Sequence, residues 1–183
     1  LVTTGPGGTN AVTGVAGAWC DSTPCLFISG QVKRADLIAG KGVRQMGFQE
    51  IDIISIVSPI TKYAVTVTEP ETIKYHLEKA VYVAKTGRPG PVWLDIPLDV
   101  QAAVIDEGVL KEFNITAEAE KPVDANILKG QANSAIQLIN QAERPVILVG
   151  NGVRLAKATD DFLEIAEILQ IPVLTTWKAM DFL

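Results

Sequence analysis

The chain has 183 residues, a hydrophobic content of 48% and a formal net charge of −5 at pH 7. This apolar content is ample for the core of one or two domains, and the acidic balance, without any block of five or six basic residues, argues against a nucleic-acid or anionic membrane partner. No apolar run approaches the roughly 20 residues that a membrane-spanning helix needs.

Short apolar runs alternate with helical patterns along the first hundred residues. The runs are LVTT, CLFIS, YAVTV and VWLDI. A helix is predicted over 10–19, a long polar loop after CLFIS, and a second helix over 70–86. Because the runs are apolar throughout rather than at every second residue, they are typical of a parallel sheet flanked by helices, that is, of an α/β fold.

The helix over 70–86 has the clearest pattern. Its apolar face comprises Ile73, Leu77, Ala80, Val81 and Ala84. Thr68 and Glu71 have the spacing of a capping box, and Gly87 is a typical helix stop.

After this helix and the run VWLDI, the periodic pattern is lost for about two dozen residues, which is longer than most connections within a domain. We therefore predict a first domain over 1–100, an interdomain linker over 101–123 and a second α/β domain over 124–183. The expected strands of the second domain are PVILVG and IPVLTT. The faces of its two expected helices comprise Leu128, Ala132, Ala135 and Ile139 in one, and Ala158, Phe162, Ile165, Ala166 and Leu169 in the other.

The chain lacks an initial methionine, begins inside an expected strand and stops at KAMDFL. We therefore expect a piece of a longer protein, truncated in both domains. Cys20 and Cys25 are the two cysteines and His76 is the single histidine. These residues cannot make up a metal-ligand set, so no metal site is predicted, and the cysteines are expected to be free thiols in a reducing cytoplasm.

The sequence GPGGTN at residues 5–10 breaks the first expected strand. It lacks the spacing and the terminal Lys-Ser or Lys-Thr of a phosphate-binding P-loop. It also has Asn10 where a dinucleotide fingerprint has its third glycine, and no acidic residue follows at the required distance. On spacing alone, a plain turn from strand to helix is an equal alternative.

Four segments taken in order, GPGGTNAVTG, DSTPCLFISGQV, GFQE and TGRPGPVWLDIPLDVQ, resemble the pyrimidine-binding domain of thiamine-diphosphate enzymes. The acetolactate synthase group is the closest likeness. RPVILVGNGVR and IPVLTTW are similar to the opening of the central, Rossmann-like domain of that family. The resemblance therefore covers nearly the whole chain.

The resemblance implies roles for individual residues. Pro6 and Asn10 match positions that line the aminopyrimidine of the cofactor, and Gln49 matches an active-site glutamine, our candidate catalytic residue, which can form hydrogen bonds without adding charge. Phe48 would supply an apolar wall. The alternatives are a solvent-facing or helix-capping amide for Gln49 and core packing for Phe48, while Glu50 is expected at the surface or at a helix start.

Arg88 in GRPGP matches an arginine that contacts FAD in the flavin-bearing members of the family. The alternative is a loop arginine paired with Asp95 or Asp99. Some members lack flavin, so the resemblance leaves FAD open.

As cofactors, the resemblance implies thiamine diphosphate and Mg²⁺, with the metal held mainly by a domain that this chain lacks. It also implies a catalytic glutamate upstream of the chain, a 2-keto acid substrate and a second subunit in a homodimer or tetramer. The expected activity is decarboxylation and carboligation by a transferase, with the 183-residue piece inactive alone. The alternatives are a lyase, decarboxylase or hydrolase of the same family, and a non-catalytic scaffold subunit.

Two features depart from the acetolactate synthase pattern. Leu98 stands where those enzymes usually have a lysine linked to the substrate channel. The loop over 31–47 is longer than usual, and its basic residues are Lys33, Arg34, Lys41 and Arg44. We expect this loop either to attract an anionic substrate or to form a solvated flap.

Overall fold

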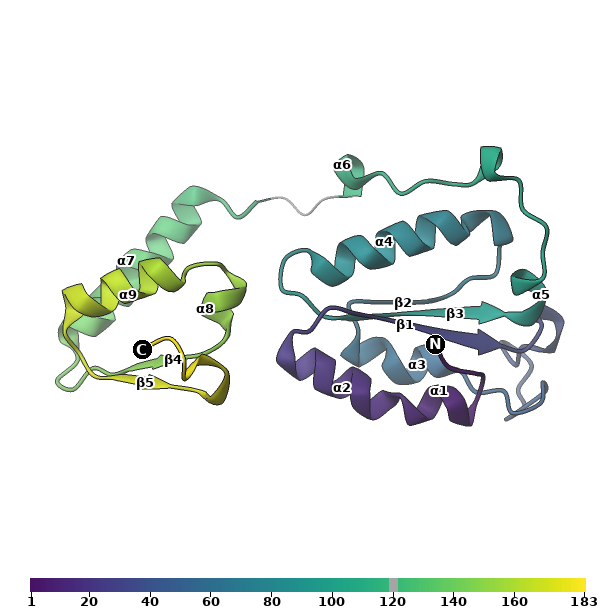
Figure 1. Ribbon diagram of the computed structural model, residues 1–183, viewed down its shortest axis with the longest axis horizontal. Coiled ribbons are helices and arrows are strands. Elements are labelled where there is room, and N and C mark those ends of the chain that lie inside the picture. The colour runs from purple at the N-terminus through teal and green to yellow at the C-terminus, as the bar shows by residue number, and fades with distance from the viewer. Residues whose placement is uncertain (119–121) are drawn as a thin grey trace. The chain divides into compact units, whose positions relative to one another are not determined.

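The computed structural model describes residues 1–118 and 122–183, and the chain divides into two compact units, Leu1–Ala119 and Glu120–Leu183 (Figure 1). Residues 119–121, part of the predicted linker over 101–123, lie outside the described residues. Each unit is described by itself below.

A parallel sheet forms the centre of the first unit. Its strands are β1 (Cys25–Gln31), β2 (Tyr63–Thr66) and β3 (Pro91–Pro97), in the order β1-β3-β2. In this register Ser29 and Thr66 both lie beside Asp95. The carboxyl ends of all three strands therefore meet at one edge of the sheet.

The expected strand LVTT contributes only an isolated parallel bridge between Val2 and Ser29. The amide of Val2 donates to the Ile28 carbonyl at 2.9 Å, and the amide of Gly30 donates to the Val2 carbonyl at 3.0 Å. The segment stays short because the chain turns at Gly5, which has a φ of 58°, and enters a helix at once. The bridge places this turn at the carboxyl edge of the sheet.

Helices lie on both faces of this sheet (Figure 1). α1 (Pro6–Asn10), α2 (Val12–Asp21) and α3 (Ile53–Val57) lie on one face, and α4 (Ile73–Lys85) lies on the other. This arrangement confirms the predicted α/β class.

The buried core has one part on each face of the sheet. The buried residues are Val15, Ile53, Val57 and Trp93 on one face, and Ala80, Ala84, Val92 and Leu94 on the other. Because side chains alternate along a strand, Trp93 faces α2 and α3, whereas its neighbours Val92 and Leu94 face α4. Both faces of β3 are thus covered, which explains its continuous apolar sequence.

Two local predictions in this unit differ from the structure. The helix expected over 10–19 is α2, which begins at Val12, and a further short helix, α1, precedes it and starts at Pro6, where the missing N–H of proline is tolerated. The prediction of a capping box formed by Thr68 and Glu71 was wrong. A 3₁₀ turn, Pro70–Thr72, precedes α4, and the Thr72 hydroxyl donates to the Glu69 carbonyl at 2.6 Å.

The chain beyond β3 remains associated with the first unit. α5 (Leu98–Gln101) follows β3 directly, and α6 (Ile115–Glu118) ends the described part of this unit. Between them the Phe113 side chain is only 8% exposed, and its amide donates to Glu78 of α4 at 2.9 Å. This part of the predicted linker is therefore packed against α4.

The second unit contains a smaller parallel sheet. Its elements are α7 (Ala125–Gln141), β4 (Ile147–Val149), α8 (Gly152–Leu155), α9 (Thr159–Leu169) and β5 (Val173–Thr175). Strands β4 and β5 pair directly and in parallel. Both strands and the two longer helices fall where the sequence pattern predicts them.

The core of the second unit is small. It consists of Val149, Ala179 and Phe182 with partly buried neighbours. Helix α7 has no buried residue, and Leu128, on its predicted apolar face, is 58% exposed. Much apolar surface in this unit is therefore open to solvent.

Among the helices of residues 1–118 and 122–183, none combines the length and the apolar character needed to cross a membrane.

Candidate functional site

The candidate site lies at the carboxyl edge of the first sheet, the edge at which open α/β sheets bind ligands. The turn at Gly5 reaches this edge through the bridge of Val2, and the loop after β1 leaves from the same edge. The segment that contains Gln49 returns to it. Two stretches about forty residues apart in sequence are thereby brought together.

The turn and the Gln49 segment touch backbone to backbone. A β-carbon built on Gly5 would lie 2.1 Å from the Gln49 carbonyl oxygen, a distance that real β-carbons do not show. Gly5 also has a φ of 58°, a conformation that side-chain-bearing residues rarely adopt. Glycine is therefore required at this position both by conformation and by space.

Gln49 has an unusual backbone of its own. It is one of four non-glycine residues with positive φ among the described residues, and its φ is 56°. The others, Ser22, Lys157 and Gln170, each follow a helix, where a left-handed residue is common. Gln49 follows no helix, and such strained residues cluster at functional sites.

Pro6 and Asn10 stand at the two ends of α1, the short helix that follows this turn. Both side chains are exposed, as is that of Gln49. About one helical turn separates Pro6 from Asn10, or roughly 5.4 Å along the axis. The structure thus brings the Pro6–Asn10 helix and Gln49 to neighbouring segments at one edge of the sheet.

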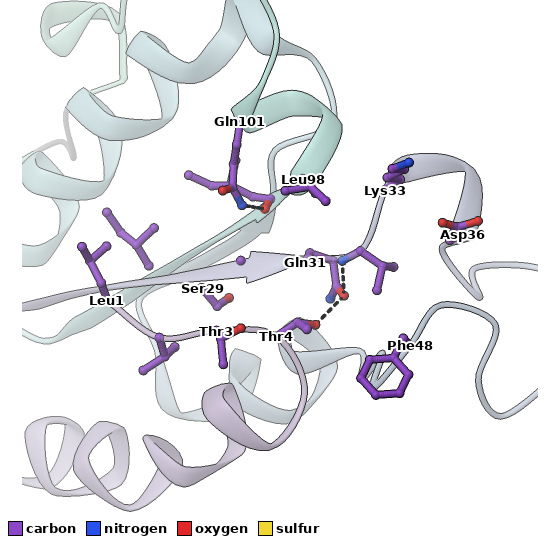
Figure 2. Close-up of a pocket in the computed structure, with 15 residues that line it drawn as sticks. Leu1, Thr3, Thr4, Ser29, Gln31, Lys33, Asp36, Phe48, Leu98 and Gln101 are labelled. Carbon is purple, nitrogen blue, oxygen red and sulfur yellow. Dashed lines mark hydrogen bonds between the residues drawn. The ribbon is translucent and has the colours of Figure 1, made fainter.

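Phe48 lies beside a cavity of about 760 Å³ at this edge, shown in Figure 2. Its side chain is 83% exposed, so it does not belong to the core. Thr4, Gln31 and Leu98 also line the cavity. Pro6, Asn10 and Gln49 lie outside its lining.

A buried polar network closes the inner side of the cavity. The Asp95 carboxylate, 1% exposed, accepts hydrogen bonds from the Ser29 hydroxyl and, at 2.9 Å, from the Gln31 amide nitrogen. The Trp93 indole N–H donates to the Ser29 hydroxyl at 2.8 Å. Burial raises the pKa of Asp95 above its usual value, although the hydrogen bonds that it accepts oppose this shift.

Glu50 is buried, which corrects the expectation that it lies at the surface or starts a helix. The side chain is 5% exposed and accepts hydrogen bonds from three backbone amides. The donors are Ile38 at 2.6 Å, Gly47 at 3.1 Å and Met46 at 3.3 Å. Because one carboxylate satisfies amides at both ends of the stretch 38–47, Glu50 organises the loop that leads to Gln49.

Two of the four basic residues of this loop, Arg34 and Lys41, are engaged within the protein. The Arg34 guanidinium donates from Nε to Asp99 at 2.7 Å and from Nη1 to the Thr68 carbonyl at 2.9 Å. The Lys41 ammonium donates to the Ala35 carbonyl at 2.7 Å. Lys33, by contrast, lines the cavity.

Arg88 lies away from the other predicted site residues. It precedes β3, whose seven residues span about 20 Å at roughly 3.3 Å each, and so it stands at the amino edge of the sheet. Its Nε donates to the Ser22 hydroxyl at 2.8 Å. The alternative pairing with Asp95 or Asp99 is wrong, since those carboxylates bind other partners.

No group of three or more His, Cys, Asp or Glu side chains within residues 1–118 and 122–183 could hold a metal ion. Cys20 and Cys25 are free thiols.

Sequence reasoning missed Thr4, Ser29, Gln31 and Asp95 as parts of this site. One signal was available: Asp95 is the single charged residue within the apolar run VWLDI. A buried carboxylate needs hydrogen-bond partners on the same face of the sheet. Ser29 and Gln31 have the period-two spacing that provides them.

The chain matches two family models. Residues 1–56 match the thiamine pyrophosphate enzyme N-terminal TPP binding domain, and residues 132–183 match the thiamine pyrophosphate enzyme central domain.

Similar curated proteins include a probable acetolactate synthase large subunit of Methanocaldococcus jannaschii, 41% identical over 177 residues, and an acetolactate synthase of Arthrospira platensis, 41% identical over 176 residues. A glyoxylate carboligase of Escherichia coli O157:H7 is 38% identical over 177 residues. These matches cover 95%, 96% and 96% of this chain but 28%, 29% and 28% of the relatives. The chain therefore spans less than a third of the length of these relatives.

Proposed function

We propose that this chain, which belongs to the thiamine pyrophosphate enzyme family, is part of a thiamine-diphosphate-dependent enzyme of the acetolactate synthase type. The enzyme would decarboxylate a 2-keto acid such as pyruvate and join the remaining fragment to an acceptor. The observation that best supports this proposal is the contact between Gly5 and Gln49, because it brings two separately identified motifs to one edge of the sheet.

The residues at this edge suit an aminopyrimidine ring. Such a ring offers both hydrogen-bond donors and acceptors on its rim and an apolar face. Asn10 and Gln49 each carry an amide with both functions, and Phe48 presents an exposed aromatic face. We propose these three residues, together with Pro6, as the contribution of this chain to cofactor binding.

When bound, thiamine diphosphate supplies the nucleophilic carbon and the electron sink for decarboxylation. Gln49 is proposed to hold the ring or the substrate carbonyl by hydrogen bonds without adding a charge that would compete with the developing one. Its positive φ sets the direction in which the side chain leaves the backbone. Phe48 and Leu98 are proposed to keep water away from this edge.

Other parts of the proposal concern the complete protein. Mg²⁺ and the diphosphate are assigned to a further domain, since the relatives extend well beyond the matched region. A second subunit is proposed from the family resemblance. If Arg88 contacts a flavin, that contact would lie at the amino edge of the sheet, apart from the candidate site at the carboxyl edge. The free thiols support a reducing compartment such as the cytoplasm.

The decisive experiment measures pyruvate consumption by the full-length protein with and without thiamine diphosphate and Mg²⁺. Gln49→Gly separates conformation from chemistry, because glycine relieves the left-handed backbone and removes the amide. We expect this variant to keep its melting temperature and to lose about tenfold to hundredfold in kcat/KM, as for the loss of one or two hydrogen bonds. A variant as active as the parent would contradict the role of Gln49, and absence of cofactor-dependent turnover on any 2-keto acid would contradict the enzyme assignment.

A second candidate is carboligation of glyoxylate. It is supported by the similarity to a glyoxylate carboligase and by Leu98, an uncharged residue that lines the cavity. Measuring kcat/KM for pyruvate and for glyoxylate under the same conditions distinguishes the two. Binding of thiamine diphosphate without turnover of either acid would instead support another reaction class, and failure to bind it would support a scaffold role.

A further inference from the structure

The Gln31 side chain, at the carboxyl end of β1, uses its whole amide group. It is 6% exposed. Oε1 accepts from the Thr4 hydroxyl at 3.0 Å and from the Val32 amide at 2.9 Å. Nε2 donates to the Ile51 carbonyl at 3.0 Å and to Asp95 at 2.9 Å. A buried side chain bonded in this way has a single orientation (Figure 2 shows the bond to Thr4).

Two of these partners flank the contact between the turn and the Gln49 segment. Thr4 immediately precedes Gly5, and Ile51 follows Gln49 by two residues. Gln31 therefore holds one segment by a side-chain hydroxyl and the other by a backbone carbonyl, on either side of the point where Gly5 meets Gln49.

Asp95 fixes the orientation of the Gln31 amide together with the Ile51 carbonyl and the Val32 amide. The carboxylate accepts a hydrogen bond from Nε2, so Oε1 is left to face the Thr4 hydroxyl. Ser29 fixes the carboxylate in turn, and the Trp93 indole fixes Ser29. The orientation of Gln31 is thus set from the core outwards. A glutamate at this position could not donate to Ile51 and would place a second carboxylate beside Asp95.

We propose that Gln31 is a positioning residue that keeps Gln49 in register with the Pro6–Asn10 helix. Its role in cofactor binding rests on the proposed function, whereas its effect on the two segments does not. Gln31 itself needs no contact with the cofactor, because it acts through Thr4 and Ile51.

The test uses Thr4→Val, which is nearly isosteric and removes one hydrogen bond to Gln31, with Thr4→Ser as the conservative variant that keeps the hydroxyl. Gln31→Leu is the stronger variant. Thr61→Val is the matched control, since the buried Thr61 hydroxyl donates to the Val57 carbonyl at 2.9 Å, before the amino end of β2. Thr61→Val also loses one hydroxyl hydrogen bond, but at the amino edge of the sheet rather than at the turn.

The first measurement is backbone hydrogen exchange in the full-length, cofactor-free protein. Thr4→Val and Gln31→Leu are expected to speed exchange at residues 5–10 and 47–51, while Thr4→Ser stays close to the parent. Thr61→Val should leave both segments protected. Unchanged exchange in Thr4→Val and Gln31→Leu, or equal loss in Thr61→Val, would overturn the proposal.

The second measurement is the dissociation constant for thiamine diphosphate in the presence of Mg²⁺, followed by protein fluorescence. Thr4→Val is expected to weaken binding about fivefold to tenfold, with recovery in Thr4→Ser and no change in Thr61→Val. Faster exchange with unchanged affinity would overturn the role of Gln31 in the cofactor site. A parent protein that binds no thiamine diphosphate would contradict the proposed function instead, and the exchange measurement would still decide whether Gln31 holds the two segments.

Discussion

Gly5 and Gln49 both adopt left-handed backbone conformations, with φ values of 58° and 56°, and they pack against each other through their main chains. Neither can change its conformation without displacing the other. This mutual constraint makes the edge of the sheet sensitive to a single added methyl group.

Gly5→Ala is therefore expected to displace the Gln49 carbonyl and to destabilise the protein. Gly5 combines a φ of 58° with a ψ of −120°, a sparsely populated conformation that costs a residue with a side chain about 1–3 kcal/mol, and the contact at 2.1 Å adds to this cost. The control is Gly17→Ala within α2, where an added β-carbon meets nothing within 4 Å and helix propensity favours alanine by about 1 kcal/mol. Thermal denaturation should show a lower melting temperature for Gly5→Ala and an equal or higher one for Gly17→Ala; a drop shared by both would refute the explanation.

Glu50 is expected to be essential to the order of the loop before Gln49. Glu50→Ala removes the carboxylate that accepts from the amides of Ile38 and Met46, whereas the Gly47 amide keeps the Asp36 carbonyl at 3.1 Å. The cost is about 1–3 kcal/mol for each amide that stays buried without an acceptor. Trypsin should then cleave after Lys41 and Arg44 faster than in the parent. In Glu107→Ala, which changes an exposed glutamate of the same unit, the cleavage rate should not change, and equal rates in all three proteins would refute this role.

Asp95 should make stability depend on pH. Its pKa is raised in the folded state because burial disfavours the charged form, so the folded protein binds the proton more tightly than the unfolded chain does. The resulting stabilisation is complete below the usual pKa of 3.8 and is lost as the pH rises through the folded pKa.

Asp95→Asn removes this titration while it keeps groups that can bond to Ser29 and Gln31. We expect a flatter dependence of melting temperature on pH above 3.8, whereas Asp95→Leu should lower the melting temperature at every pH, because two buried partners lose their bonds. A parallel pH dependence in the parent and Asp95→Asn would show that another group is responsible.

The layers of the fold could be predicted from the sequence because the strands are apolar on both faces, and the order of the motifs along the chain indicated the family. The short helix α3 could not be predicted from the sequence, because the apolar run over residues 51–60 has neither a clear helical period nor the length of a typical helix. LVTT reads as a strand, yet the left-handed turn at Gly5 limits its pairing to one bridge.

The motifs GPGGTN and GFQE meet at one edge of the sheet, through the contact between Gly5 and Gln49. The burial of Glu50 could not be predicted, because its partners are backbone amides and carry no sequence signal. The position of Arg88 at the opposite edge likewise follows from the register of β3 rather than from its motif. Which segments lie at the same edge thus depends on long-range strand pairing, which local sequence does not show.

The second unit should make the isolated 183-residue chain associate with itself. Leu148 and Leu174 are register partners on neighbouring strands, and they are 68% and 57% exposed. Side chains paired across strands lie on the same face, so the two leucines form a continuous apolar surface. Replacing both with threonine preserves the tendency to form strands and should shift light scattering toward the monomer. Val104→Thr removes a fully exposed apolar residue of the first unit and should have no such effect. A parent chain that is already monodisperse and monomeric would refute the prediction.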